Sequence, residues 1–173
     1  MSRIILTSDP HLGHKNIHKF RKIYGHEFVD EAAHRQWLMG EYAAAFKPND
    51  HIIVTGDVAF TREALAEFGK LPGQKALVRG NHDDFSTKEY LEVFHDVYGL
   101  WNWKSFWLSH APIHPTEFRG RINLHGHVHG ATLPDSRYFN LCVDNLQTVF
   151  GRPWCTLEEV RYLRPRTKEL EDR

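Results

Sequence analysis

The stretch SDPHLGHKNIH, residues 8–18, holds one aspartate and three histidines directly after a short apolar run. Two metal-binding arrangements fit this spacing. Asp9 and His11 could reach one ion from the end of a strand, whereas His14 and His18 have the i, i+4 spacing that zinc-binding helices use. The stretch by itself leaves both arrangements open.

Polar side chains of the same kinds follow later apolar runs, at the point where each run ends in a turn. The five clusters along the chain are Asp9/His11, Asp57, Asn81/His82, His110 and His127/His129. Any one of them would be an ordinary turn, since Gly and Asp favour turns. In open α/β sheets, however, the ligand crevice lies outside the carboxyl ends of the strands, so five clusters in register with the strand pattern indicate one shared site.

These clusters need strands to position them, and short apolar runs that end at turn residues predict such strands. The expected strands are residues 3–8, 51–55, 75–78, 103–109, 121–125 and 138–143. Apolar residues at helical spacing, preceded by capping residues, predict helices over residues 30–46, 61–69, 86–94 and 156–163. The alternation of strand and helix in the first half indicates a layered α/β domain with some parallel pairing, while the strand-rich second half could pair antiparallel.

The bulk composition limits the class of protein. A chain of 173 residues suits one domain, residues 1–173, with a core that needs no disulfides. The formal net charge of zero argues against broad attraction to nucleic acid or to an anionic membrane, although a local basic patch stays open. The two cysteines form no disulfide framework and no paired zinc motif, so we expect a reducing, cytoplasmic setting. We expect neither a signal peptide nor a membrane-spanning segment.

Seven of the clustered side chains are potential metal ligands: Asp9, His11, Asp57, Asn81, His110, His127 and His129. Carboxylate, imidazole and amide donors suit Mn, Fe, Zn or Ni rather than a soft thiolate site, and Mn is our default. Seven ligands exceed the usual four of a structural zinc site but suit two divalent ions about 3.5–4 Å apart. Such a pair activates water and clamps the oxygens of an in-line displacement at phosphorus.

The ordered motifs resemble those of the calcineurin-like metallophosphoesterase superfamily: D-x-H, G-D, G-N-H-[DE], H and G-H-x-H. In this chain they stand at residues 9–11, 56–57, 80–83, 110 and 126–129. The resemblance implies a two-sheet β-sandwich flanked by helices, with the metal site at the carboxyl ends of the strands. It also implies that one metal is held by Asp9, His11, Asp57 and His129, and the other by Asp57, Asn81, His110 and His127, so that Asp57 bridges them.

The resemblance further implies that His82 stands next to the phosphate, where it stabilises the transition state or protonates the leaving oxygen. An imidazole, whose pKa is ordinarily near ~6.5, can serve as such an acid at physiological pH. Asp83, the next residue, could orient His82 or cap the following turn.

Protein phosphatases of this superfamily carry GDxVDRG in the second block. Here residues 56–62 are GDVAFTR, which lack the second aspartate and displace the arginine, so a protein phosphatase is not expected. A chain close to the minimal core favours phosphodiesters, nucleotides or nucleic-acid ends, with diesters preferred to monoesters. Residues 8–17, 142–144 and 156–160 also resemble a subgroup of small bacterial and phage phosphoesterases, which leaves the substrate open.

Three residues are candidates for substrate binding. His14 and Asn16 follow the first expected ligands and could face the phosphate, and Arg119 could reach it from between His110 and His127. The basic run over residues 15–22 is either a solvated face or a site for further phosphates of a nucleotide or a strand.

Aromatic residues offer a second hypothesis for how a substrate is bound. Trp101 and Trp103 could stack a base, although such residues more often belong to a core. A different class of function is a non-catalytic scaffold or binding module built on the same fold, which the complete ligand set disfavours. Within the opening stretch, Asp9 and His11 become the expected ligands, and Pro10 is expected to keep Asp9 out of a helix.

Overall fold

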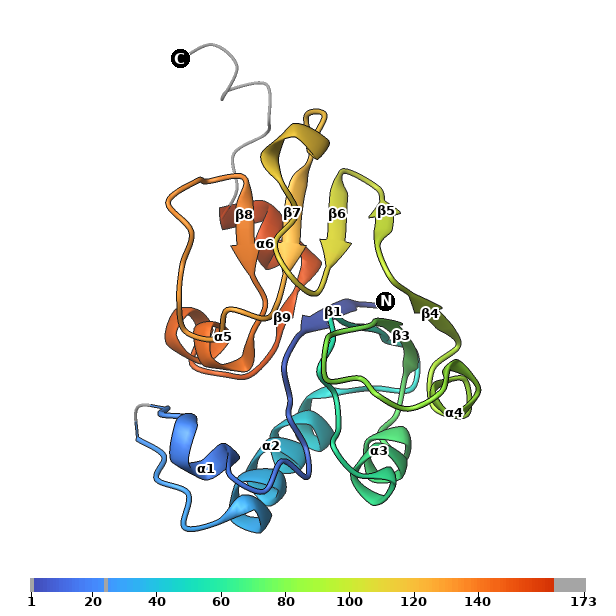
Figure 1. Ribbon diagram of the computed structural model, residues 1–173, viewed down its shortest axis with the longest axis vertical. Helices are drawn as coiled ribbons and strands as arrows, with labels where there is room; N and C mark the ends of the chain where they lie inside the picture. The colour runs from blue at the N-terminus through green and yellow to red at the C-terminus, as the bar shows by residue number, and fades with distance from the viewer. Residues whose placement is uncertain (1, 24, 164–173) are drawn as a thin grey trace.

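The computed structural model describes residues 2–23 and 25–163, which form two β-sheets flanked by helices (Figure 1). The strand order is β4-β3-β2-β1-β9 in the first sheet and β5-β6-β7-β8 in the second. Figure 1 shows the second sheet above the first, with α2 and α3 below the first. The predicted α/β class and two-sheet architecture are confirmed.

The first sheet is mainly parallel. Its strands are β1 (Ile4–Thr7), β2 (His51–Val54), β3 (Gln74–Val78), β4 (Asp96–Tyr98) and β9 (Cys155–Thr156). The first four pair in parallel, and β9 pairs antiparallel with β1. The apolar runs predict β1, β2 and β3, whereas β4 and β9 are not predicted because strands of three and two residues show no alternation of apolar and polar side chains.

The second sheet contains β5 (Trp101–Trp103), β6 (Phe106–Ser109), β7 (Ile122–His125) and β8 (Tyr138–Asn140). The expected single strand over residues 103–109 is wrong: the chain turns at Lys104, whose φ is +54°, so that β5 and β6 pair as an antiparallel hairpin. The other pairings, β6 with β7 and β7 with β8, are parallel. Antiparallel pairing therefore holds for the hairpin but not for the rest of this sheet.

The described helices are α1 (Ile17–Phe20), α2 (Glu31–Ala45), α3 (Arg62–Gly69), α4 (Thr87–Tyr90), α5 (Val143–Phe150) and α6 (Leu157–Leu163), with a 3₁₀ turn, η1 (Pro115–Glu117). Asp30 and Thr61 cap α2 and α3 by accepting bonds from backbone N–H groups three residues on. The strand expected to Val143 stops at Asn140, whose Oδ1 accepts from the Cys142 N–H, and α5 begins where strand was predicted. The helix expected over residues 86–94 is a single turn, α4.

Alternate residues of the first sheet pack into two separate cores. Ile5, Ile52 and Leu77 belong to the cluster that includes residues of α2 and α3. Leu6 and Ile53, their neighbours in sequence, belong to the cluster that includes the second sheet. Because both faces of these strands are buried, the strands are continuous apolar runs, and polar side chains begin only where the strands end.

Candidate active site

All five polar clusters lie in loops that leave the carboxyl ends of strands: β1, β2, β3, β6 and β7. The loops bond to one another through backbone groups. The N–H groups of Asp9 and His11 donate to the carbonyls of Gly56 and Asp57, each at 3.0 Å, and that of Gly126 donates to His110 at 2.8 Å. The convergence expected from the sequence is therefore present in the structure.

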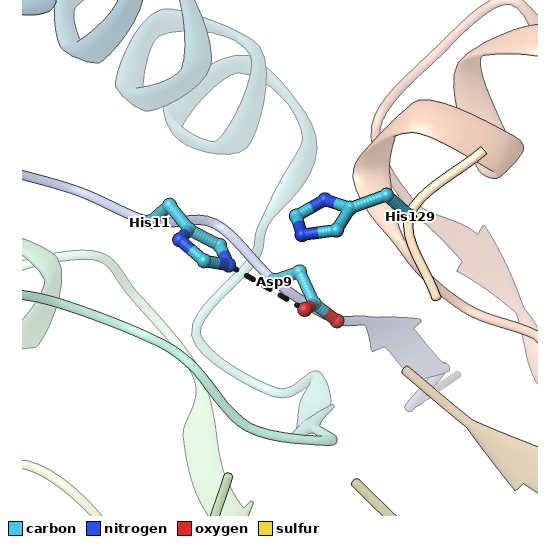
Figure 2. A group of neighbouring side chains, drawn as sticks. All are labelled: Asp9, His11 and His129. Carbon is cyan, nitrogen blue, oxygen red and sulfur yellow. Dashed lines mark ion pairs between the residues drawn. The ribbon is translucent and has the colours of Figure 1, made fainter. Parts of the chain in front are cut away.

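One group of potential ligands consists of Asp9, His11 and His129, whose donor atoms lie within 4.8 Å of one another. Figure 2 shows the two imidazole rings beside the Asp9 carboxylate. The distance from Asp9 Oδ1 to His11 Nε2 is 3.5 Å. Asp9 Oδ2 accepts from Ser8 Oγ at 2.6 Å, the His127 N–H at 2.9 Å and Cys142 Sγ at 3.1 Å. These bonds fix the carboxylate and leave Oδ1 free to face the histidines.

Two atoms of this group are polar, buried and without a hydrogen-bond partner among the described residues: Asp9 Oδ1 and His11 Nε2. Buried polar atoms are ordinarily satisfied, and two unsatisfied atoms that face one another are explained by an ion or a water held between them. A carboxylate oxygen and an imidazole nitrogen are suitable donors for a divalent transition-metal ion. The residues present therefore fit a metal.

Asp57 lies between the first group and a second one. Its Oδ2 is 3.5 Å from His11 Nε2 and 3.4 Å from His110 Nε2. The Nδ1 of His110 bonds to the Thr55 carbonyl at 2.8 Å, which directs Nε2 towards the site. Asn81 Oδ1 lies 2.9 Å from His110 Nε2 and 2.9 Å from His127 Nδ1. Donor atoms of all seven expected ligands thus gather in one place.

The environment sets the charge of these groups. Burial opposes ionisation of Asp9, but contact with His11 and the field of His110 outweigh it and hold the pKa of Asp9 well below its ordinary value. The pKa of Asp57 is lowered because His110 outweighs burial in the same way. Burial lowers the pKa of His11. Burial opposes a charge on His110, but the carboxylates of Asp57 and Asp9 outweigh it and raise the pKa of His110. Metal binding requires ionised carboxylates and neutral imidazoles, so His110 would release a proton when a metal binds.

His82 stands at the exposed mouth of the site. Its backbone N–H donates to Asp57 Oδ1 at 2.9 Å, and its ring centroid is 5.9 Å from that of His11. Among the described residues, the Asp83 side chain makes no hydrogen bond to the His82 ring and none that caps the following turn. Asp83 is buried and accepts from the backbone N–H groups of Asp57 at 2.9 Å, Val58 at 3.0 Å and Gly80 at 2.8 Å, so it ties two motif turns together.

A buried arginine that the sequence placed in a basic run also serves the site. The Arg21 guanidinium donates to the carbonyl of Asp9 at 2.5 Å, that of Pro10 at 3.0 Å, and Asp144 Oδ2 at 3.2 Å. Asp144 Oδ2 is in turn 3.3 Å from His129 Nδ1. This contact raises the pKa of His129, and although burial opposes it, the field of Arg21 lowers the pKa of Asp144 to about 2.

Five of the seven expected ligands have positive φ: Asp9 (+56°), His11 (+52°), Asp57 (+54°), His127 (+71°) and His129 (+50°). Such values are uncommon outside glycine, and they cluster at functional sites where surrounding structure enforces them. The extended conformation that Pro10 favours for the preceding residue is not adopted by Asp9. Gly126 permits close packing here, because a Cβ on it would lie 2.0 Å from Ser8 Oγ and 2.3 Å from Asp9 Oδ2.

The substrate candidates are placed differently from one another. The half-buried His14 ring is 5.9 Å from the His11 ring and 4.5 Å from that of Phe60, so it borders the site. Asn16 is exposed before α1 and makes no side-chain capping bond. Arg119 has a side chain 75% exposed and pairs with Glu117 at 3.8 Å; among the described residues it contacts no expected ligand.

Trp101 and Trp103 lie away from the site. They pack against the second core cluster and line a pocket together with Ile4, His51 and Gln74, which begin β1, β2 and β3. This pocket is therefore at the amino ends of those strands, opposite the five clusters. The structure does not bring the two tryptophans to the site, and their part-buried packing is that of core residues.

The fold and the Asp/His groups define a class of metal-dependent hydrolase. The calcineurin-like phosphoesterase family matches residues 2–159, and the chain belongs to this family. It is a metal-dependent phosphoesterase by family, with side-chain groups able to hold a metal.

Two proteins similar to the chain carry names that state no activity. The uncharacterized protein MJ1445 of Methanocaldococcus jannaschii is 27% identical over 146 residues, which cover 81% of this chain and 77% of MJ1445. The crystal structure of a protein of unknown function, AQ665 from Aquifex aeolicus, matches with a TM-score of 0.68 at 23% identity. That match covers 94% of this chain and all of the other, and it supports the fold alone. Among the described residues, every helix is too short or too polar to span a bilayer.

Proposed function

We propose that the protein is a dinuclear metal-dependent phosphoesterase that hydrolyses phosphate esters of nucleotides or nucleic-acid-derived substrates, with diesters preferred to monoesters. The observation that carries the proposal is the position of Asp57 Oδ2, 3.5 Å from His11 Nε2 and 3.4 Å from His110 Nε2. One carboxylate oxygen between imidazoles of two groups is the arrangement that a bridging ligand needs.

Two divalent ions, for which Mn remains our default, would supply an activated water and positive charge opposite the phosphate oxygens. Asp9, His11 and His129 would hold one ion, and Asn81, His110 and His127 would hold the other, with Asp57 shared. The protein's own contribution is to keep the carboxylates ionised and to direct His110 Nε2 inwards through its bond to the Thr55 carbonyl.

His82 would deliver a proton to the leaving oxygen. Its exposed ring lies at the mouth of the site, 5.2 Å from the Phe60 ring, while its backbone N–H holds Asp57 Oδ1. A positioned acid of this kind contributes about 10²–10⁴-fold to a rate. His14, which also borders the site, would contact the phosphate, whereas Asn16 and Arg119 would have to approach a substrate from its periphery.

An open site supports small or flexible substrates. Asn81, His82, His127 and His129 are all exposed. Exposure of these groups suits a nucleotide or a strand end, which can be bound without enclosure. A reducing, cytoplasmic setting belongs to the same proposal and is supported by the two cysteines, Cys142 and Cys155, which are free and buried.

The test begins with chelator-treated protein, to which Mn²⁺ is returned. We expect bound metal to rise to two ions per chain by elemental analysis, and turnover of bis(p-nitrophenyl) phosphate to appear with it. Asp57→Asn should abolish turnover and reduce bound metal, and His82→Ala should lower kcat about 10²–10⁴-fold with metal content retained. Asp96→Asn and His51→Ala, exposed positions at the opposite edge of the first sheet, are matched controls.

Full activity in metal-stripped protein would overturn the proposal. Two bound metals without turnover of any monoester, diester or cyclic nucleotide would instead favour the scaffold or binding-module alternative. A preference for p-nitrophenyl phosphate over its diester would reverse the expected order of substrates.

A further inference from the structure

A line of aromatic rings leads from the metal ligands to the protein surface. The His11 ring is 5.9 Å from the His14 ring, and the His14 ring is 6.2 Å from that of Phe20 at the end of α1. Phe60 fills the inner side, 5.3 Å from His11 and 4.5 Å from His14. Phe20 itself is 70% exposed, so a large aromatic face is presented to solvent two ring contacts from a metal ligand.

The same segment is strongly basic in a chain with no net charge. Residues 10–26 contain three lysines and one arginine and no aspartate or glutamate. The Arg21 guanidinium is buried and forms an ion pair with Asp144. Lys15, Lys19 and Lys22 are exposed, and within the described ranges none of their ammonium groups forms an ion pair with a carboxylate. Their charge is therefore available to a ligand.

Two of these cations, Lys19 and Lys22, also border a hollow rather than a flat face. A cleft of about 1010 Å³ beside α1 is lined in part by His18, Lys19, Lys22 and His26, with Glu27 as a carboxylate in its wall. A concave surface that carries several cations concentrates negative charge, and it does so next to an exposed ring.

We propose that residues 15–22, which include α1, are a binding site for single-stranded nucleic acid, in which Phe20 stacks a base and Lys15, Lys19 and Lys22 contact successive phosphates. Proteins that hold single strands without reading their sequence combine these two elements, a cationic groove and an aromatic face. Three cations suit a strand better than a mononucleotide, which has phosphate at one end only. The inference rests on the proposed function, because the strand would lead into the same phosphoesterase site.

Binding can be measured without turnover, by fluorescence anisotropy of a labelled single-stranded oligonucleotide with the metal-free protein. The triple substitution of Lys15, Lys19 and Lys22 to Gln should weaken binding and lower the slope of log K against log salt by about 2, since each phosphate contact in a single strand contributes about 0.7. Lys47, Lys70 and Lys104, also exposed, form the matched triple that removes the same charge elsewhere. That control should keep the wild-type slope.

The aromatic part of the site needs its own variants. Phe20→Ala should weaken oligonucleotide binding about tenfold or more, whereas Phe20→Tyr, which keeps a stacking face, should restore it. Neither should alter the salt slope, because no charge changes. This separates stacking from electrostatic attraction.

Several results would overturn the inference. They are an unchanged slope in the Lys15/Lys19/Lys22 triple, an equal loss in the control triple, full binding by Phe20→Ala, or binding of a phosphorylated peptide with the same dependence on these residues. Wild-type turnover of bis(p-nitrophenyl) phosphate is measured in parallel. Turnover without oligonucleotide binding would overturn this site alone, and absence of turnover with two metals bound would overturn the proposed function.

Discussion

Two aspartates that are not expected ligands stand behind the site, and they support it in different ways. Asp144 touches the side chain of an expected ligand, His129, and shares a buried arginine with the carbonyl of Asp9. Within the described part of the chain, the Asp83 side chain makes no hydrogen bond to the side chain of an expected ligand; it accepts from the backbone N–H groups of Asp57 and Gly80. Asp144 therefore orients the His129 imidazole through its charge, and Asp83 fixes the backbone conformation of two turns through hydrogen bonds.

The difference determines how far a change at each place should spread. A substitution at Asp144 should change the orientation and charge of the His129 ring alone. A substitution at Asp83 should move the backbone of Asp57, the residue expected to bridge both metals. Outer groups of either kind orient ligands, and their loss commonly lowers metal affinity 10–100-fold. Variants of the two regions should therefore differ in how many metals they lose.

The largest effect is expected from Arg21→Met, which removes the cation of the Asp144 region. Asp144 and the carbonyls of Asp9 and Pro10 would lose their donor in a buried setting. Breaking a buried pair from one side costs about 3–5 kcal/mol, and we expect that loss in the free energy of unfolding of the metal-free protein. Urea denaturation measures it, and Arg35→Met, whose pairs with glutamates are partly exposed, is the control. If the Arg21→Met protein were as stable as the control, the buried ion pair would not be what stabilises the Asp144 region.

Asp83→Ala should have the next largest effect. The N–H groups of Asp57, Val58 and Gly80 would be left without their acceptor, and the Tyr90 hydroxyl would lose a bond of 3.2 Å. We expect destabilisation of about 2–4 kcal/mol, because bonds to an ionised acceptor contribute about 1.5–3 kcal/mol each and do not add fully. Elemental analysis should show less metal bound at both sites. Retention of either metal at wild-type affinity would contradict the view that Asp83 acts through the shared ligand.

Asp144→Asn is a milder change, because an amide oxygen can still accept from Arg21. The negative charge beside His129 Nδ1 is lost, so we expect one metal to bind about 10–100-fold more weakly and the other to be unaffected. Titration calorimetry with Mn²⁺ resolves the two sites. An equal loss of affinity at both metal sites would show that Asp144 and Asp83 act alike. It would contradict the difference inferred between the two regions.

The last effect, which is the smallest when it is counted per pH unit, is a dependence of stability on pH in the Arg21 region. Burial and the field of Arg21 lower the pKa of His34 to about 3, and its Nε2 lies 2.9 Å from an Arg21 nitrogen. Between about pH 6.5 and 3 the unfolded chain binds a proton that the folded chain excludes. Stability of the metal-free protein should therefore fall as pH falls through this window, by at most about 1.4 kcal/mol per pH unit from this group. His34→Gln should flatten the dependence in urea titrations at pH 5 and 7.5; an unchanged slope would contradict it.

Sequence patterns predicted the parts of the site that follow strands directly. Each expected ligand comes within four residues of a strand end, so the apolar run and the motif locate it together. Arg21 and Asp144 could not be paired in this way, because they lie 123 residues apart and a buried arginine looks like any other member of a basic run. The family motifs likewise do not specify Asp83 as a backbone acceptor, since its bonds go to turns 25 and 26 residues earlier.

The fold shows the same limit. Strands buried on both faces, such as β2, were predicted because their apolar runs are unbroken. The β5–β6 hairpin was missed because a run of aromatic residues continues through its turn at Lys104. The start of α5 was missed because Asn140 ends the strand through its own side chain, a bond that no periodicity reveals.

The left-handed backbone conformations of the expected ligands lower the stability of the folded protein. Function and thermal stability therefore place opposite demands on these residues. Each strained residue costs of order 1–3 kcal/mol, and at the exposed His127 and His129 little burial is gained in return. Glycine at either position would relieve this strain while removing an expected metal ligand. A laboratory selection for thermal stability alone is therefore expected to favour substitutions at these expected ligands first. The resulting variants would be more stable and would have lost activity.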